Sequence, residues 1–419
     1  MTKSLKTDMA PPQSSSLPNG WHIVRFGDVA KKISDIVDRK NCDLDHFVAG
    51  EHMQTDDFRI KEWGTMDNGY LGPAFNHKFS KGQILYGSRR TYLRKVSIPH
   101  FDGVCANTTF VIEPTGDDLI PELLPFVMQS AGFNEQSIRM SKGSTNPYIN
   151  WKDIACYEFA VPEKKEQRRI ATTLWATEDC IVKGERFVAA AEQAKQVLMR
   201  ELFSKGIGHF KFKGIKWIGN VPEGWHIIKI KDFTTVIRGA SPRPKGDSRY
   251  YDGPVPRLMT EDVTRDGMWV HAEIDSLTED GAKLSRFLKK GSLVLICSGG
   301  KETVGLPGLL SHDACIHDGF LALTKINDTV ANEEFLYYWF LYYQKTMEQI
   351  ATHGCAFINL TTDIISNLTI TLPPLQEQRQ IVSILSHCDS TIAASRTNLI
   401  ATRALKMKLI GQFFSRVGN

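Results

Sequence analysis

The residues whose types could do chemistry do not combine into a catalytic motif. Lys301 follows a glycine, as in the phosphate-binding loop G-x-x-x-x-G-K-[ST], but Leu295 stands at the first glycine and Glu302 at the hydroxyl. The segment Asn146–Tyr148 resembles the N-P-P-Y signature of adenine methyltransferases. It lacks one proline, however, and no F-x-G-x-G cofactor loop occurs in the chain. We therefore expect this chain neither to bind ATP nor to transfer methyl groups.

Two further groups could hold a metal ion. Residues 163–165 fit the E-x-K half of a nuclease site, with Asp153 upstream, but the triplet stands at the start of a predicted helix, where a solvated first turn is the better interpretation. The second group, His312, Cys315 and His317, has zinc-binding side chains but no obvious fourth ligand. We expect ordinary turn and core residues here, and hence no metal site and no catalytic residue.

The composition is that of a globular protein. Hydrophobic residues make up 42% and charged residues 23% of the 419 positions, a length typical of two or three domains. The eight cysteines include no C-x-x-C pair, so we expect reduced thiols. The first 16 residues lack the apolar core of a signal peptide, and no apolar run approaches the ~20 residues of a membrane helix. These features predict a cytoplasmic protein.

The chain repeats one plan twice. The segment LPNGWHIVRFGDVAKKI at 17–33 is matched 204 positions later by VPEGWHIIKIKDFTTVI at 221–237. A second match, 211 positions apart, joins PEKKEQRRIATTLWATEDCI at 162–181 to PPLQEQRQIVSILSHCDSTI at 373–392. Between these anchors the likeness is thin. The repeat therefore predicts that the two halves share one arrangement of elements, although the sequences between the matched segments have diverged.

A heptad pattern begins in each of the two segments of this second match, 162–181 and 373–392. Apolar residues recur in alternating steps of four and three, from Ile170 through Leu198 to Leu202 in the first copy and over the same levels in the second. The pattern predicts long helices over 162–206 and 373–416. A single apolar stripe needs a partner, so we expect the two helices to form an antiparallel coiled coil within the chain, around a pseudo-two-fold axis. Dimerisation arms that reach another molecule remain an alternative.

The rest of the chain has strand-like runs without regular βαβ alternation, which predicts the α+β class. The expected architecture is two globular mixed α/β domains separated by the two long antiparallel helices. Its remaining segments are a flexible tail at 1–16, a first domain at 17–161, a linker at 207–220 and a second domain at 221–372.

Positive charge is concentrated in one strip of each copy. No acidic residue occurs from Gly69 to Phe101 or from Gly281 to Lys301, and a further basic loop at 238–250 precedes the second strip. Both domains are slightly acidic overall, so two local basic strips are typical of binding sites for two stretches of phosphate backbone. Solvated lysine faces are the alternative.

Several motifs together resemble one known family. They are the P-x-G-W opening of each half, the G-S-R-R-T-Y-L-R-K strip, the Gly143–Asn150 segment with its echo at Gly354–Asn359, and the P-x-x-x-E-Q-R-x-I start of each long helix. This combination is similar to the specificity subunit of Type I restriction-modification systems. The resemblance covers nearly the whole chain from Leu17, and its specific signal is the doubled arrangement.

The resemblance implies a non-catalytic DNA-recognition subunit. Each target recognition domain would read one half of a bipartite sequence in double-stranded DNA. Methylation would belong to two modification subunits carrying S-adenosylmethionine, and cleavage to restriction subunits using ATP and Mg²⁺. This chain would bind no cofactor itself. A non-enzymatic two-headed coiled-coil scaffold that binds protein partners is the alternative from a different functional class.

Arginine can contact guanine and asparagine can contact adenine through paired hydrogen bonds, so the polar residues of the basic strips are the DNA-binding candidates. In the first copy they are Arg89, Arg90, Tyr92, Arg94 and Lys95, and in the second Arg243, Lys245, Arg249, Ser298 and Lys301. The Gly143–Tyr148 loop, with Asn146, is a further candidate. The EQR segments are candidates for subunit docking, with capping and surface charge as an equal alternative. Their residues are Glu166, Gln167, Arg168, Glu377, Gln378 and Arg379.

Overall fold

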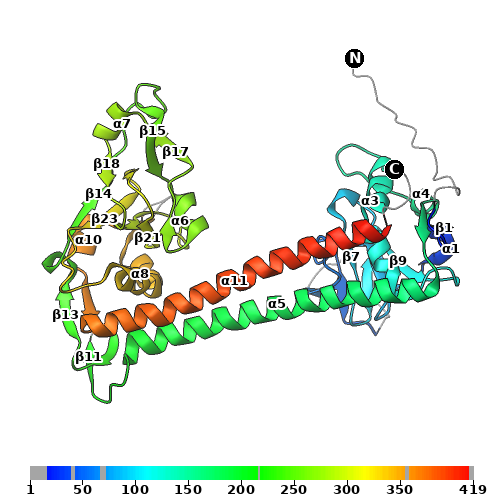
Figure 1. Cartoon of the computed structure of the whole chain (residues 1–419), viewed down its shortest axis with the longest axis horizontal. Coiled ribbons are helices and arrows are strands. Elements are labelled where there is room, and N and C mark those ends of the chain that lie inside the picture. Colours follow the sequence, from blue (N-terminus) through cyan, green and yellow to red (C-terminus); the bar gives the residue numbers. More distant parts are fainter. Residues whose placement is uncertain (1–16, 39–42, 67–71, 216–217, 354–357, 415–419) are drawn as a thin grey trace. The chain divides into compact units, whose positions relative to one another are not determined.

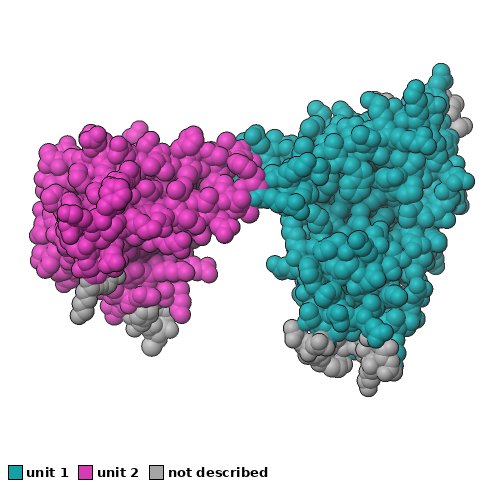
Figure 2. Space-filling model, turned by 90° about the horizontal axis from the view of Figure 1, so that it is seen from below, with its two compact units in different colours: residues 1–186, 396–419 teal, residues 187–395 magenta. Residues whose placement is uncertain are grey.

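The computed structural model describes residues 17–38, 43–66, 72–215, 218–353 and 358–414. The chain forms two compact units (Figure 2). Unit 1 comprises residues 1–186 and 396–419, and unit 2 comprises residues 187–395. Among the described residues, no helix has both the length and the apolar character needed to cross a membrane.

Unit 1 contains two four-stranded sheets and a separate strand pair (Figure 1). The first sheet has the order β2 (Ala30–Ile33), β9 (Thr109–Pro114), β6 (Ile84–Gly87) and β7 (Val96–Ser97). The second has the order β4 (Gly64–Thr65), β3 (His46–Val48), β8 (Gly103–Ala106) and β5 (Phe75–Phe79). The pair is β1 (His22–Arg25) with β10 (Glu158–Val161). Strands β6, β8 and β9 are almost wholly buried, which suits their inner positions in the sheets.

Short helices complete unit 1. They are α1 (Phe26–Val29), α2 (Leu124–Gln129), α3 (Ala131–Arg139), α4 (Trp151–Ala155) and the 3₁₀ helices η2 (Thr91–Leu93) and η3 (Pro121–Leu123). Helix α2 is buried along its whole length, and Phe126 and Phe133 join the core beneath the first sheet.

Unit 2 contains a five-stranded and a four-stranded sheet. The first has the order β14 (Thr235–Arg238), β23 (Phe320–Thr324), β19 (Leu293–Ile296), β21 (Pro307–Leu310) and β16 (Trp269–Val270). The second has the order β17 (Asp275–Leu277), β15 (Tyr251–Leu258), β22 (Ala314–Ile316) and β18 (Arg286–Leu288). Two smaller sheets pair β13 (His226–Lys229) with β26 (Thr369–Leu372), and β20 (Ser298–Gly299) with β25 (Ile358–Asn359) and β24 (Thr352–His353).

The helices of unit 2 include one that is nearly all aromatic or aliphatic and lies in the core, α8 (Glu333–Tyr342). The others are α6 (Thr260–Asp266), α7 (Glu279–Lys283), α9 (Gln344–Ile350), α10 (Thr362–Ser366) and the 3₁₀ helix η4 (Ile230–Asp232). The predicted linker 207–220 contributes to a hairpin, in which β11 (Phe212–Ile215) pairs with β12 (Gly219–Pro222).

The two units share most of their strand topology even where their sequences diverge, and unit 2 adds β16 beside β21. Ile33 of β2 faces Val111 of β9, and Ile237 of β14 faces Ala322 of β23 at the equivalent positions of the repeat. The one parallel pair of each four-stranded sheet also corresponds, β3 with β8 and β15 with β22. The α+β class is therefore confirmed, and the repeat extends through the interior of each domain.

The structure corrects one detail of the sequence match. Asn150 precedes α4 and Thr361 precedes α10 as N-cap residues 211 positions apart, so these two residues are equivalent. The echo that aligned Asn150 with Asn359 is displaced by two residues. Residues 354–357 of that echo lie outside the described residues.

The long helices are α5 (Lys164–Lys205) and α11 (Leu375–Phe414), predicted over 162–206 and 373–416. Most of the apolar heptad positions of the two helices, which form the seam between them, are buried or half-buried. Leu198 is an exception, since it is 37% exposed and Met199 is buried in its place. The strict heptad alternation therefore fails near the end of α5, because the core of unit 2 takes up the adjacent face of the helix.

Within each unit, α5 and α11 pack antiparallel (Figure 1). In unit 1, Glu178 and Glu185 of α5 contact Lys406 and Arg403 of α11, so positions rise along one helix as they fall along the other. In unit 2, Lys195 of α5 contacts Asp389 of α11 in the same sense. The part of each helix inside a unit therefore has a partner from the same chain.

A buried glutamine attaches each long helix to its own domain. The amide of Gln167 donates to the carbonyls of Asp118 and Pro162 and accepts from the Ile120 N–H, at 2.8–2.9 Å. The amide of Gln378 makes the same three bonds, to Val330, Pro373 and Asn332. Both glutamines have 0% exposure.

We predict that Gln378→Ala lowers the free energy of unfolding of unit 2 by about 2–3 kcal/mol, because it leaves buried backbone groups without partners. Urea titration followed by circular dichroism measures the change. Gln376→Ala, at an exposed position two residues earlier in the same helix, is the matched control and should change the free energy by less than about 0.5 kcal/mol. Equal effects of the two variants would contradict the anchoring role.

Candidate nucleic-acid interface

In unit 1, two predicted segments meet at one surface. The chain leaving β6 forms a bridge between Arg89 and Tyr148, and the Arg90 N–H donates to the Pro147 carbonyl at 2.7 Å. The Ile149 N–H donates to the Ser88 carbonyl at 2.9 Å. The basic strip and the Gly143–Tyr148 loop, over 50 residues apart in sequence, therefore form one composite surface.

The basic loop has a constrained backbone. Arg90 and Arg94, on either side of η2, have φ values of 50° and 46°, in the left-handed region that costs L-residues free energy. The Arg90–Pro147 hydrogen bond holds one end of the turn. At the other end, the Thr55 hydroxyl donates to the Leu93 carbonyl at 2.9 Å. The loop is therefore shaped before any ligand binds.

The six candidates of unit 1 divide into two groups. Arg89, Arg90, Tyr92 and Asn146 are exposed at this surface. The other two, Arg94 and Lys95, are partly buried, and their charged groups contact other residues of the same domain. Arg94 forms an ion pair with Asp56, and the Lys95 ammonium donates to the Gly50 carbonyl. Burial, together with the nearby Arg90 charge, lowers the pKa of Lys95.

One further exposed aromatic residue of this surface was not singled out from the sequence. Tyr148 is 41% exposed, and the Arg89 guanidinium lies 5.9 Å from the centre of its ring. The sequence placed Tyr148 at the end of a candidate loop without naming it as a contact residue, and the structure pairs it with Arg89 in a short β-bridge. Together, Arg89, Arg90, Tyr92, Asn146 and Tyr148 present cationic, aromatic and amide groups on one face.

Unit 2 builds the same kind of surface at the equivalent place. Ser298 of β20 faces Asn359 of β25, as Arg89 faces Tyr148 in unit 1. The Leu360 N–H donates to the Cys297 carbonyl at 2.8 Å, matching the bond from Ile149 to Ser88. Lys301 follows this bridge and is exposed. We call this pairing of two chain segments the loop crossing. It joins residues 88–90 to 147–149 in unit 1 and residues 297–299 to 358–360 in unit 2, so it is common to both copies although its side chains differ.

Arg243 lies next to this surface in unit 2. Its guanidinium is 3.5 Å from the carboxylate of Asp318, and the following residue, Gly319, accepts a hydrogen bond from the Ser298 N–H. The Ser241 hydroxyl donates to Asp318 at 2.6 Å and is the main cause of a lowered pKa for that carboxyl. Arg243 and Ser298 are therefore brought together, while both Arg243 and Lys245 remain exposed.

Arg249 has a different environment. Its guanidinium forms a forked pair with Asp247, at 2.6 Å from Nη2 and 3.0 Å from Nε. These hydrogen bonds lower the pKa of Asp247 to about 2. Arg249 therefore holds the turn of its own loop, although it remains on the surface.

The EQR segments also divide by exposure. Gln167, Gln378 and Glu377 are buried. Glu377 accepts hydrogen bonds from the Ile207 N–H, at 2.9 Å, and from the Trp225 indole, at 3.3 Å, and so ties the end of α5 to the start of α11 in unit 2. The remaining residues, Glu166, Arg168 and Arg379, have solvent-accessible side chains.

The possible metal ligands do not converge. Cys315 is buried in β22, and the imidazole of His317 accepts a hydrogen bond from the Gly319 N–H at 2.9 Å. Burial and the nearby Arg257 lower the pKa of His317. Within the described part of the chain, no three His, Cys, Asp or Glu side chains are grouped as metal ligands.

Comparison with known proteins decides the family. The model of the Type I restriction modification DNA specificity domain matches residues 18–185 and again residues 222–402. The chain belongs to this family. Its two matched regions correspond to the two copies of the repeat, and the sequence-based resemblance is confirmed.

Relatives in this family cover nearly the whole chain. The Type I restriction enzyme MjaVIII specificity subunit of Methanocaldococcus jannaschii is 24% identical, over 94% of this chain and 92% of its own length. The HindI specificity subunit of Haemophilus influenzae is 22% identical, over 73% of this chain and 80% of its own. DNA sequence recognition is therefore the function of this family member, and the protein-binding scaffold is not favoured.

Solved structures share the fold. A chain from a study of assembly in the type I R-M system has a TM-score of 0.61 at 20% identity, covering 94% of this chain and 98% of its own. The S subunit of a Type I system from M. genitalium has a TM-score of 0.54 at 15% identity, covering 97% and 99%.

We predict that Arg249→Ala raises the pKa of Asp247 from about 2 toward the ordinary carboxyl range, because it removes the forked hydrogen bonds. Carbon-13 NMR of the Asp247 carboxyl as a function of pH measures this. Arg243→Ala, six residues earlier in the same loop, is the control and should leave the titration of Asp247 unchanged. A carboxyl that already titrates near pH 4 in the unaltered protein would contradict the pairing.

Proposed function

We propose that each unit reads one half of a bipartite target in double-stranded DNA. The observation that carries this proposal is the loop crossing after β6 and its equivalent after β19, which presents different side chains on one shared frame, exposed Arg89 and Tyr148 in unit 1 and half-buried Ser298 and Asn359 in unit 2. A shared frame with variable side chains suits two readers of different sequences. The residues proposed to contact the DNA are Arg89, Arg90, Tyr92, Asn146 and Tyr148 in unit 1, and Arg243, Lys245, Ser298 and Lys301 in unit 2.

Charge and geometry suggest which of these residues contact phosphates and which contact base edges. Lysines and flexible arginines at the rim contact phosphates, which contribute affinity that falls with salt. Arginine and asparagine side chains on the constrained loops contact base edges, where a paired hydrogen bond discriminates by about 1–3 kcal/mol. We assign Arg94, Lys95 and Arg249 to shaping their loops, because their charged groups already have partners within the chain.

The helix pair would set the spacing of the two readers. We propose that α5 and α11 form one antiparallel coiled coil with a pseudo-two-fold relation between the copies. The contact between Glu178 and Lys406 recurs as that between Asp389 and Lys195, each residue shifted by 211 positions, which supports this symmetry. Half-sites read from one side of a duplex lie about one helical turn apart, and a stiff rod would fix such a separation.

The chemistry would belong to other subunits. We propose that the chain is non-catalytic and acts in the cytoplasm with two modification subunits, which carry S-adenosylmethionine, and with restriction subunits, which use ATP and Mg²⁺. Exposed charges at the start of each long helix are candidates for docking the modification subunits. These are Glu166, Arg168 and Arg379.

The direct experiment is selection from a random duplex library by the chain assembled with its modification subunits. We expect enrichment of a sequence in two specified halves with an unspecified spacer. Enrichment of one continuous sequence, or of none, would contradict the proposal. A methyl-transfer assay on this chain alone should be blank.

We predict that the double variant Arg89→Ala/Arg90→Ala lowers discrimination at one half-site by about tenfold or more and leaves the other within twofold, because only one unit loses its base contacts. Competition binding with duplexes scrambled in either half measures both ratios. Arg25→Ala removes an exposed arginine of the same unit outside the loop crossing and should change neither ratio. An equal loss at both half-sites would assign the arginines to general electrostatics.

Replacing residues 221–372 by the same segment of another family member should change only one half of the selected sequence. The equivalence of strand topology between the copies is the physical reason, since each domain supplies its own loop crossing. A change in both halves would contradict independent reading.

A further inference from the structure

A buried lysine of α11 lies at the base of unit 1. Lys406 is 2% exposed, and its ammonium donates to the Glu178 carboxylate of α5 at 2.7 Å. The ammonium lies 4.5 Å from the ring centre of Phe58, which limits its access to water. Burying an ammonium group costs free energy unless it is paired and hydrogen-bonded. The groups that accept hydrogen bonds from Lys406 are therefore expected to stay in place.

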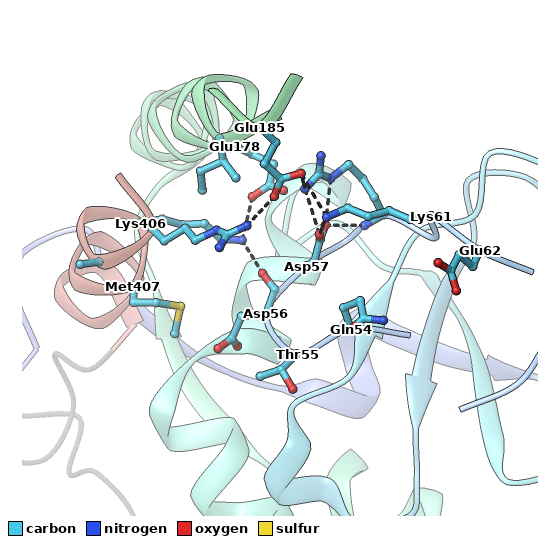
Figure 3. A pocket seen from close by; sticks show the side chains of 14 residues that line it. Gln54, Thr55, Asp56, Asp57, Lys61, Glu62, Glu178, Glu185, Lys406 and Met407 are labelled. Atoms are coloured by element: carbon cyan, nitrogen blue, oxygen red, sulfur yellow. Dashed lines mark hydrogen bonds and ion pairs between the residues drawn. The ribbon is translucent and has the colours of Figure 1, made fainter. Parts of the chain in front are cut away.

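The third contact of Lys406 leads to the DNA-facing loop. Its ammonium donates to the backbone carbonyl of Asp56 at 3.2 Å. Figure 3 shows Lys406 between Glu178 on one side and the Asp56 turn on the other, at the edge of a cavity of about 580 Å³. Asp56 itself has a φ of 56°, so its turn is in the left-handed region. A strained turn keeps its conformation only when its surroundings hold it.

Asp56 in turn holds the loop. Its carboxylate pairs with Arg94, and its N–H donates to the Arg94 carbonyl at 3.5 Å. The neighbouring Thr55 bonds to Leu93, the last residue of η2. The path from Lys406 through the Asp56 turn therefore ends at the 3₁₀ helix that carries Tyr92 and follows Arg90.

The repeat supplies a natural comparison. Lys195 is the equivalent of Lys406, and its acid partner Asp389 is the equivalent of Glu178. Lys195 lies 5.4 Å from the ring centre of Tyr338, whose hydroxyl donates to Asp389 at 2.7 Å. The hydrogen bonds found for the Lys195 ammonium within the described residues do not include one to a loop backbone. The lysine–carboxylate pair is thus common to both copies, buried in unit 1 and partly exposed in unit 2, whereas the hydrogen bond from the lysine to a loop backbone is found in unit 1.

We propose that Lys406 is a positioning residue for DNA reading by unit 1. By fixing the Asp56 turn against α5 and α11, it holds the Arg90–Arg94 loop in its reading conformation and couples that loop to the packing of the helix pair. This inference rests on the proposed function, since it concerns how the same loop reads its half-site. A purely structural lysine would affect stability without favouring one half-site.

The test compares Lys406→Met with Lys195→Met in the full chain assembled with its modification subunits. Methionine keeps the apolar stem and removes the charged donor. The probes are the library-selected duplex and two versions with one or the other half scrambled. The half-site of unit 1 is identified beforehand by Arg89→Ala/Arg90→Ala, so failure of that step counts against the proposed function and not against the role of Lys406.

We expect Lys406→Met to lower discrimination at the half-site of unit 1 by about tenfold and to leave the other half-site within twofold. Lys195→Met should leave both ratios within twofold, although both variants lower the thermal unfolding temperature. Unchanged discrimination in folded Lys406→Met, or equal losses at both half-sites for the two variants, would overturn the proposal.

A milder pair of variants keeps the test decisive if Lys406→Met does not fold. Glu178→Gln weakens the support of Lys406 without removing the lysine, and Asp389→Asn is its equivalent in unit 2. We expect only Glu178→Gln to lower discrimination, by at least threefold and at the half-site of unit 1. Equal behaviour of these two variants would overturn the positioning role.

Discussion

The register of α5 against α11 within each unit depends on a lysine–carboxylate contact that the chain makes twice. Glu178 of α5 pairs with Lys406 of α11, and Asp389 of α11 pairs with Lys195 of α5, so the two helices exchange roles between the two contacts. Each unit therefore has a lysine–carboxylate contact between the two long helices at positions related by the repeat. Apolar seam residues supply the free energy of packing, whereas a buried ion pair contributes little net stability and serves mainly to fix register. If one long helix were shifted by one turn along the other within a unit, the lysine of that unit would no longer reach its carboxylate.

A fixed register lets the two domains diverge elsewhere. Each long helix is attached to its own domain by a buried glutamine, Gln167 or Gln378, and the two domains share the strand order of one four-stranded sheet and the first four strands of the other. The loop crossing is then free to change its side chains. Arg89 opposite Tyr148 in one copy becomes Ser298 opposite Asn359 in the other without altering the backbone hydrogen bonds that join the two segments. The side chains at this crossing therefore differ between the copies without a change in the backbone pairing.

The sequence predicted the repeat, the two long helices and the position of the basic strips, because each of these is a local pattern or a direct match. It did not predict the equivalence of the domain interiors, since strand pairing depends on contacts between distant residues of unlike sequence. It also did not separate Arg90 from Arg94, whose ion pair with Asp56 spans 38 residues. For the same reason it assigned Gln167 to docking, although Gln167 is buried against Asp118 and Ile120. Burial of a polar side chain is set by tertiary contacts, and composition or spacing alone does not reveal it.

The central claim is that α5 and α11 of one molecule pair with each other. A side chain at Gly184 would lie 3.4 Å from the Leu399 side chain, so Gly184→Cys and Leu399→Cys place two thiols within reach of a short bis-maleimide. The measurement is crosslinking of this double variant at low concentration, with the exposed Cys156 and Cys180 replaced by serine. We predict a crosslink within one chain, which runs as a monomer on a denaturing gel and carries the mass of one bridging reagent, whereas two unbridged thiols would each carry a reagent of their own. Crosslinks that join two chains, or none at all, would contradict it.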